Sequence, residues 1–218
     1  MTGDASVTMT PTIEDPWRRI ALPYAPPSAR PALAALWALD EALGRVVAAT
    51  TQPLIGQLRL TWWHERLCAL DAGERLAEPV LAALAAHVLP MGVTGAALVA
   101  LVEGWEVLLD DLPIGAEALG EYAAGRGGAL FALSATVLGS GAERALGEGW
   151  ALIDFAARCS DPETAERAWQ MAGARLDGGI SGPKPLRILA RLARVRAREP
   201  FDRVSLPLSR WTMLRAIL

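Results

Sequence analysis

Few side chains in this 218-residue chain could do chemistry, and their spacing is unpromising. His64 and His87 are the only histidines, and neither belongs to a recognisable set of metal ligands. The sequence has no G-x-S-x-G nucleophile motif and no phosphate-binding glycine loop. The adjacent pair Asp110–Asp111 points in two directions about 100° apart if it is helical, which is poor for sharing one metal ion. Residue types and spacing alone therefore predict neither a metal site nor a nucleophile.

Composition sets the class of protein that must position any such residues. The chain is 52% hydrophobic but only 6% aromatic, and the good helix formers alanine and leucine dominate it. This predicts an all-α protein, long enough for one sizeable domain. A net charge of -3 without a basic tract argues against nucleic-acid binding. Cys68 and Cys159 are the only cysteines, so a reducing, cytoplasmic location is expected.

Helical patterns follow one another with short breaks, and no stretch alternates with period two for long enough to predict a strand. Asp161 is predicted to cap a helix that begins at Pro162. Residues 1–14 are predicted to be a loose tail, and residues 15–218 a single helical domain. The predicted helices cover 28–50, 53–73, 78–89, 94–112, 116–138 with an interruption at "GRGG" (125–128), 142–159, a stretch from 162 to the loop at 176–185, 186–198 and 206–218.

The most apolar stretch, residues 80–102, is too interrupted to span a membrane. A spanning helix needs about 20 continuous apolar residues, whereas this stretch contains His87, Pro90 and Gly92. It predicts two buried helices joined at "PMG" (90–92). Peripheral contact with the inner membrane stays open, because so apolar a chain has little spare polar surface.

Residues 57–67, "QLRLTWWHERL", place two adjacent tryptophans among charged and polar side chains. This stretch resembles the segment P-x-x-G-x-[IL]-R-L-x-W-W-x-x-x-L of the squalene/phytoene synthase family. "RPALAALWALDEALGRVV" (30–47) and "EYAAGRGGALFALSATVLG" (121–139) resemble that family in the same order. The matched positions of the tryptophan segment are Pro53, Gly56, Leu58, Arg59, Leu60, Trp62, Trp63 and Leu67.

The resemblance implies a single-domain helical bundle of the isoprenoid synthase type around an apolar central cavity. Active members of the family join two prenyl diphosphates head to head. The diphosphate leaving group needs Mg²⁺, and Mg²⁺ needs carboxylate oxygens. In active members, two aspartate-rich motifs on facing helices supply them.

The first aspartate-rich motif of the family resembles Y-A-F-C-R-x-x-D-D-x-x-D. Laid over this chain, its tyrosine falls on Trp37, and its three aspartates fall on Gly44, Arg45 and Ala48. The second motif falls on "EGWALIDFAARCSDPE" (148–163), with its aspartate on or near Arg158. A guanidinium places a fixed positive charge where a divalent cation should bind. The resemblance therefore implies a family member with degraded metal sites.

The resemblance also implies which residues lie at the cavity. The predicted cavity or substrate-binding residues are Trp37, Arg45, Arg59, Trp62, Trp63, Tyr122, Gly127 and Gly128. The two tryptophans of the pair are expected mainly as packing anchors. Arg59 is expected to form a buried ion pair with Glu65 or Glu103, and Arg45 could bind a diphosphate without metal.

Three functions follow from these observations. The first is a non-catalytic assembly or lipid-binding factor without a cofactor, because the sequence resembles a branch of the family that acts in assembly of respiratory complex I and its bacterial relatives. Its partner is a respiratory subunit or an apolar lipid or isoprenoid. The second is an active prenyltransferase that uses Mg²⁺ with unusual ligands, Asp40, Glu41, Asp154 and Asp161. The third is a helical bundle that binds an apolar molecule or a partner helix. Four or more acidic side chains converging on one pocket would argue for the second.

Overall fold

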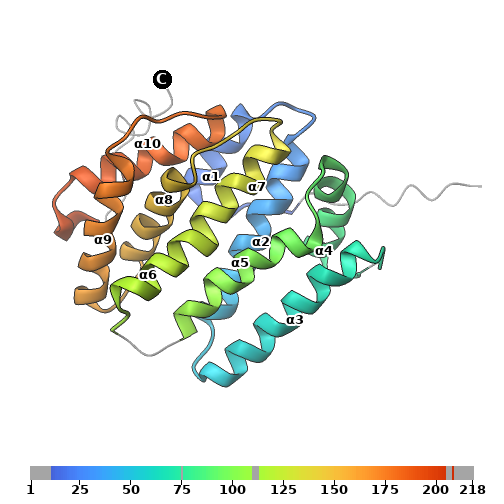
Figure 1. Cartoon of the computed structure of the whole chain (residues 1–218), viewed down its shortest axis with the longest axis horizontal. Coiled ribbons are helices and arrows are strands. Elements are labelled where there is room, and N and C mark those ends of the chain that lie inside the picture. Colours follow the sequence, from blue (N-terminus) through green and yellow to red (C-terminus); the bar gives the residue numbers. More distant parts are fainter. Residues whose placement is uncertain (1–10, 75, 110–112, 205–207, 209–218) are drawn as a thin grey trace, which may run out of the picture.

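The computed structural model describes residues 11–74, 76–109, 113–204 and 208. These residues form a bundle of helices without a strand, so the predicted all-α fold class is confirmed (Figure 1). The helices are α1 (Pro16–Ala21), α2 (Arg30–Ala48), α3 (Pro53–Asp71), α4 (Pro79–Ala83), α5 (Gly95–Glu106), α6 (Ala116–Tyr122), α7 (Ala129–Val137), α8 (Arg144–Ala156), α9 (Pro162–Leu176) and α10 (Lys184–Arg198). Short 3-10 or π-helical turns are η1 (Leu22–Tyr24), η2 (Leu84–Val88), η3 (Leu89–Met91), η4 (Val107–Leu109), η5 (Ala123–Gly128) and η6 (Phe201–Arg203).

Most of helix α2 is buried in the bundle. It packs against α4, α5 and α7, and its leucines and alanines between Ala32 and Leu43 are almost completely excluded from solvent. Trp37 lies within this core, and its indole N–H donates to the hydroxyl of Ser134 on α7 at 3.2 Å. Figure 1 shows α3 at one edge of the bundle and α9 and α10 at the opposite edge. The carboxylate of Asp40 on α2 therefore sits in the core, where it needs partners.

Several predicted helices are divided or extended in the structure. Residues 116–137 form one continuous path of α6, the π-helical turn η5 and α7. The segment predicted at 78–89 consists of α4, η2 and the start of η3. Helix α1 was not predicted, although Asp15 caps it and Pro16 occupies its first position. The predicted cap at Asp161 is confirmed, since its carboxylate accepts the N–H of Thr164 at 2.8 Å.

Two residues of the predicted tail, Ile13 and Glu14, are held against the bundle. The side chain of Ile13 is buried in the core, and the N–H of Glu14 donates to the Glu41 carboxylate at 2.9 Å. The prediction assigned these residues to the tail because the surrounding sequence is polar, whereas Glu14 is held by Glu41 and Arg45 of α2. Residues 1–10, the pair Asp110–Asp111 and most of the predicted helix 206–218 lie outside the described residues.

The prediction of two helices joined at "PMG" is confirmed. Gly92 ends η3 with a φ of 86°, which suits glycine, and α5 begins three residues later. Across the part of the chain that the structure describes, no helix is both long and apolar enough to pass through a bilayer.

The "GRGG" stretch brings three helical segments into backbone contact. A Cβ placed on Gly127 would lie 2.2 Å from the carbonyl oxygen of Gly147 on α8. A Cβ on Gly104 of α5 would lie 2.4 Å from the backbone nitrogen of Arg126. The glycines therefore serve close packing of η5 between α5 and α8, as the sequence predicted.

Replacing Gly127 with alanine is expected to lower the free energy of unfolding by about 1–3 kcal/mol, because backbone atoms of α8 must move to admit the methyl group. Gly120→Ala is the matched control. Gly120 lies on α6 with no neighbouring atom within 4 Å of an added Cβ, so that variant should be neutral or up to about 1 kcal/mol more stable. Urea unfolding of both variants measures the difference. Equal effects of the two substitutions would contradict the packing role of Gly127.

Candidate functional site

A cavity of about 410 Å³ opens between the start of α1, α2, η4, η5 and α8. One part of its wall is apolar, and the other is densely charged. The apolar and uncharged lining residues are Pro16, Gly44, Val47, Ala48, Trp105, Leu108, Tyr122, Phe155 and Cys159. The charged lining residues are Glu14, Asp15, Arg18, Asp40, Glu41, Arg45, Arg126, Asp154 and Arg158. The expectation of an apolar cavity is therefore correct for only part of its surface.

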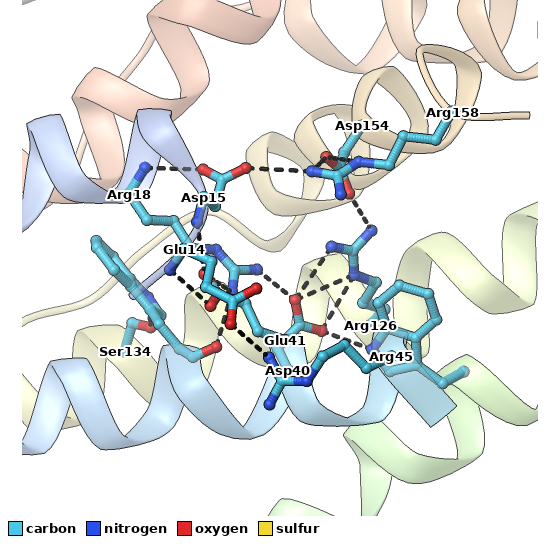
Figure 2. Close-up of polar contacts among 12 residues, drawn as sticks. Glu14, Asp15, Arg18, Asp40, Glu41, Arg45, Arg126, Ser134, Asp154 and Arg158 are labelled. Carbon is cyan, nitrogen blue, oxygen red and sulfur yellow. Dashed lines mark hydrogen bonds and ion pairs between the residues drawn. The ribbon is translucent and has the colours of Figure 1, made fainter. Parts of the chain in front are cut away.

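Asp40 is the centre of the charged wall, and its side chain is fully excluded from solvent. Its carboxylate accepts hydrogen bonds from the guanidinium groups of Arg18 and Arg126, the latter at 3.1 Å. The indole N–H of Trp105 donates to the same carboxylate at 2.7 Å. Figure 2 shows Arg18 and Arg126 approaching Asp40 from two sides. Asp40 is thus saturated by donors from three other elements of the bundle.

These donors determine the pKa of the Asp40 carboxyl group. Burial alone would raise the pKa of its carboxyl group, but the charges of Arg126 and Arg18 and their hydrogen bonds outweigh burial. The pKa of Asp40 is therefore held well below its ordinary value. The carboxylate stays ionised at any physiological pH, so it is no general acid.

Arg126 joins Asp40 to a second carboxylate. It reaches Asp154 of α8 at 2.8 Å and also donates to the hydroxyl of Tyr122. Arg158 pairs with the other oxygen of Asp154 at 2.8 Å, one turn further along the chain. Burial raises the pKa of Asp154, but the positive charges of Arg126 and Arg158 lower it by more than burial raises it. The net shift of this pKa is therefore downward. The two arginines and two aspartates form one continuous chain of ion pairs (Figure 2).

The position of Arg126 is fixed by its surroundings as well as by its ion pairs. Its guanidinium carbon lies 4.2 Å from the ring centroid of Trp105 and 4.9 Å from that of Trp150. Such cation–π contacts stabilise a guanidinium that has left water. The π-helical turn η5 carries Arg126 at the point where the glycine contacts bring this segment against α5 and α8.

A short segment before α1 crosses the cavity mouth. The backbone N–H groups of Glu14 and Asp15 donate to the Glu41 carboxylate at 2.9 and 3.1 Å. The side chain of Glu14 pairs with Arg45 at 3.5 Å, and that of Asp15 pairs with Arg158 at 3.2 Å. This segment therefore brings two further carboxylates to the cavity.

The positions that the sequence alignment assigned to metal-binding aspartates do lie together. Gly44, Arg45 and Ala48 on α2 and Arg158 after α8 all line this one cavity. A Cβ on Gly44 would lie 3.0 Å from the indole ring of Trp105, so an acidic side chain there would meet that ring. The geometry supports the alignment, and the residue types at these positions are two small residues and two arginines.

Comparison with known proteins shows the family. The family described as squalene/phytoene synthase matches residues 17–171, which is most of the chain. This chain belongs to the squalene/phytoene synthase family. A crystal structure of a dehydrosqualene synthase in complex with ligand superposes with a TM-score of 0.69. The match covers 92% of this chain and 88% of that chain at 13% identity, which shows a shared fold. No curated protein matches this chain.

Mg²⁺, which active members of the squalene/phytoene synthase family require, does not fit this cavity. Five acidic residues line it, so the number of carboxylates that would favour an enzyme is reached. Each of them, however, is paired with an arginine of the same cavity. Within the described residues, no three His, Cys, Asp or Glu side chains are arranged to hold a metal ion. The four guanidinium groups of the cavity already engage the carboxylates that a divalent cation would need as ligands.

The structure divides the predicted site residues of this family member into three groups. Arg45 and Tyr122 line the cavity, as do Asp40, Glu41 and Asp154 of the alternative catalytic set. Trp37, Gly127 and Gly128 are buried in the packing around it without lining it. Asp161 caps α9 and does not line the cavity, which removes it from the alternative set.

Helix α3 corrects three predictions. Arg59 is exposed, so the expected buried ion pair with Glu65 or Glu103 is wrong. Trp62 is 43% exposed, whereas its neighbour Trp63 is 7% exposed and belongs to the core. The rings of the pair meet edge to face at 5.2 Å. None of these three residues lines the cavity, because α3 lies at the edge of the bundle.

Sequence reasoning missed the two most buried cations of the site. Arg18 and Arg126 lie far from Asp40 in the sequence, and the Arg126 contact spans 86 residues. One signal was available: Arg126 is the charged residue of "GRGG", in a stretch otherwise made of small and apolar residues. A charge buried among glycines needs a partner, and that partner must be acidic.

Proposed function

We propose that this protein is a non-catalytic member of its family whose cavity binds an apolar molecule carrying an anionic group. One observation carries this proposal. Gly44, Arg45, Ala48 and Arg158 line the cavity at the positions that family resemblance assigns to metal-binding carboxylates. Guanidinium groups at those positions oppose a divalent cation and favour an anion.

The shape and lining of the cavity support a small amphiphilic ligand. Its volume of about 410 Å³ falls within the range of about 300–1,000 Å³ that is typical of small-molecule sites. Val47, Leu108 and Phe155 provide apolar contacts beside the charged wall. A ligand that combines an apolar chain with an anionic end matches both parts.

Native mass spectrometry of the full chain tests this function. We expect an apolar molecule to co-purify with the protein. Otherwise, added farnesyl diphosphate should bind in the presence of EDTA and raise the midpoint temperature of thermal unfolding. A protein that carries no ligand, and whose unfolding midpoint is unchanged by farnesyl diphosphate in EDTA, would overturn the proposal.

A second candidate function is assembly of respiratory complex I at the inner-membrane surface. The observation that favours it is an exposed apolar row on α3, where Leu54, Leu58 and Trp62 are 66%, 60% and 43% exposed. These residues recur every four positions, so they share one side of the helix. Such a row is typical of a surface that binds a protein partner. Deletion of the gene should then reduce assembled complex I, and a chain with all three residues changed to serine should fail to restore it.

An active prenyltransferase with Mg²⁺ is the third candidate, because five carboxylates share the cavity. Its ligands would be Asp40, Glu41 and Asp154. Isothermal titration with Mg²⁺ separates it from the first proposal. We expect no saturable heat, because each carboxylate already has a guanidinium partner; stoichiometric Mg²⁺ binding that Asp154→Asn removes would favour the enzyme.

A further inference from the structure

Two kinds of arginine line the cavity, and they differ in burial and in their ion-pair partners. Arg18 and Arg126 are 1% and 5% exposed and are held by Asp40. Arg45 and Arg158 are 56% and 65% exposed, and they stand at the mouth on α2 and after α8. Only the second kind can reach a ligand without breaking the buried core.

The acidic partners of these mouth arginines come from one short segment. Glu14 pairs with Arg45, and Asp15 pairs with Arg158. The segment is placed by its backbone, since the N–H groups of Glu14 and Asp15 donate to Glu41. Neighbouring residues thus present two carboxylates to two cationic groups at the entrance, as a ligand with two negative charges would.

We propose that residues 14 and 15 form an acidic strap that competes with the anionic head of a ligand for Arg45 and Arg158. The head is a phosphate or diphosphate, bound by guanidinium groups without metal, and the apolar chain extends along Val47, Leu108 and Phe155. This inference rests on the proposed function, and it adds the head group and a built-in competitor.

The strap is weak enough to be displaced. Both members of the Glu14–Arg45 pair are largely exposed, at 71% and 56%, and exposed ion pairs are held loosely. Asp15 is anchored more firmly, because its carboxylate also caps α1 by accepting the N–H of Arg18 at 2.9 Å. Arg158 keeps Asp154 as a partner when Asp15 leaves. The Glu14 side chain is therefore the part of the strap that is displaced first. Its release from Arg45 breaks no contact of the buried ion pairs.

Equilibrium binding in EDTA tests the strap, with farnesyl diphosphate, inorganic pyrophosphate and farnesol as separate probes. Glu14→Gln removes the competitor for Arg45 and should tighten farnesyl diphosphate about 2- to 5-fold. Arg45→Gln and Arg158→Gln each remove a charged donor and should weaken it about tenfold or more. Glu163→Gln and Arg167→Gln are matched controls, since that ion pair lies outside the cavity, and neither should change affinity.

Comparison of the three probes shows whether the anionic head or the apolar chain of the ligand responds to the substitutions. Pyrophosphate should show the same order of variants as farnesyl diphosphate, and farnesol should bind equally to all of them. The strap is overturned if Glu14→Gln leaves the affinity unchanged or weakens it, if no variant binds, or if farnesol responds like farnesyl diphosphate. Turnover of the prenyl probe with Mg²⁺ would instead overturn the proposed function, whatever the strap variants show.

Discussion

Replacing Asp40 with alanine is expected to lower the free energy of unfolding by about 3–5 kcal/mol. The substitution leaves the guanidinium groups of Arg18 and Arg126 buried without their shared carboxylate, and it removes the acceptor for the Trp105 indole N–H. Arg126 keeps Asp154 and Arg18 keeps Glu41 as a partner, but two buried guanidinium groups that lose their shared carboxylate cost far more than an exposed contact. Denaturant unfolding followed by circular dichroism measures the change.

The control removes a carboxylate from an exposed pair of the same chemistry. Glu163→Ala breaks the ion pair with Arg167, which should cost only about 0.3–0.5 kcal/mol. Asp40→Asn retains the size of the side chain and gives a measurable midpoint if the alanine variant is unfolded in buffer. Similar small losses for Asp40→Ala and Glu163→Ala would show that Asp40 is not the centre of a buried network.

Acid unfolding gives a second readout of the same carboxylate. The pKa of Asp40 is lower in the folded protein than the ordinary value of about 3.9. Its stabilisation is therefore complete above about pH 4 and is lost as the pH falls from there through the lowered folded value. The wild-type protein should lose stability over this acidic range more steeply than Asp40→Asn, which has no carboxyl group to protonate there.

Replacing Trp63 with alanine is expected to cost about 3–5 kcal/mol, because a large buried ring leaves a cavity in the core. Trp62→Ala should cost no more than about 1.5 kcal/mol, which is the scale of the edge-to-face contact it loses. The two residues are adjacent and of the same type, so the two substitutions are well matched. Denaturant unfolding again measures the free energy of unfolding. Equal losses would mean that both rings support the core and that α3 has no free face.

The tryptophan pair shows a limit of predicting the buried face of a helix from the spacing of its apolar residues. Helix α3 carries one apolar row that is buried, Leu60, Trp63 and Leu67, and another that is exposed, Leu54, Leu58 and Trp62. Both rows have the spacing of a core face, so the pattern cannot say which one packs. Only the position of α3 at the edge of the bundle, in contact with α5, decides it.

The helices themselves were more predictable than the site. The order of the helices, the Asp161 cap and the turn at Gly92 follow from local signals that the sequence displays. Resemblance aligned Gly44, Arg45, Ala48 and Arg158 with metal-binding positions of two motifs on facing helices, and all four residues line one cavity. The ion pairs were not predictable in this way, since they join α1, α2, η5 and α8 across long separations, and such pairings depend on the finished packing.

The charged wall is the physical basis of the proposal that this family member works without a metal ion. Five carboxylates and four guanidinium groups line the cavity, and each carboxylate contacts a guanidinium group, so the wall has a net charge of only -1 without a cation. Under the function that we propose, the same fold keeps a cavity for a prenyl-like molecule and lacks the metal chemistry that would cleave it. In the same proposal, an anion reaches the exposed arginines at the mouth by displacing Glu14 and Asp15.

Turnover is the most direct test of this account. The full chain is incubated with farnesyl or geranylgeranyl diphosphate and increasing Mg²⁺, beside an active synthase as a positive control, and substrate, released pyrophosphate and hydrocarbon are quantified. The account predicts that the substrate is recovered intact at every Mg²⁺ concentration. A head-to-head condensation product with released pyrophosphate, abolished by EDTA, would contradict it.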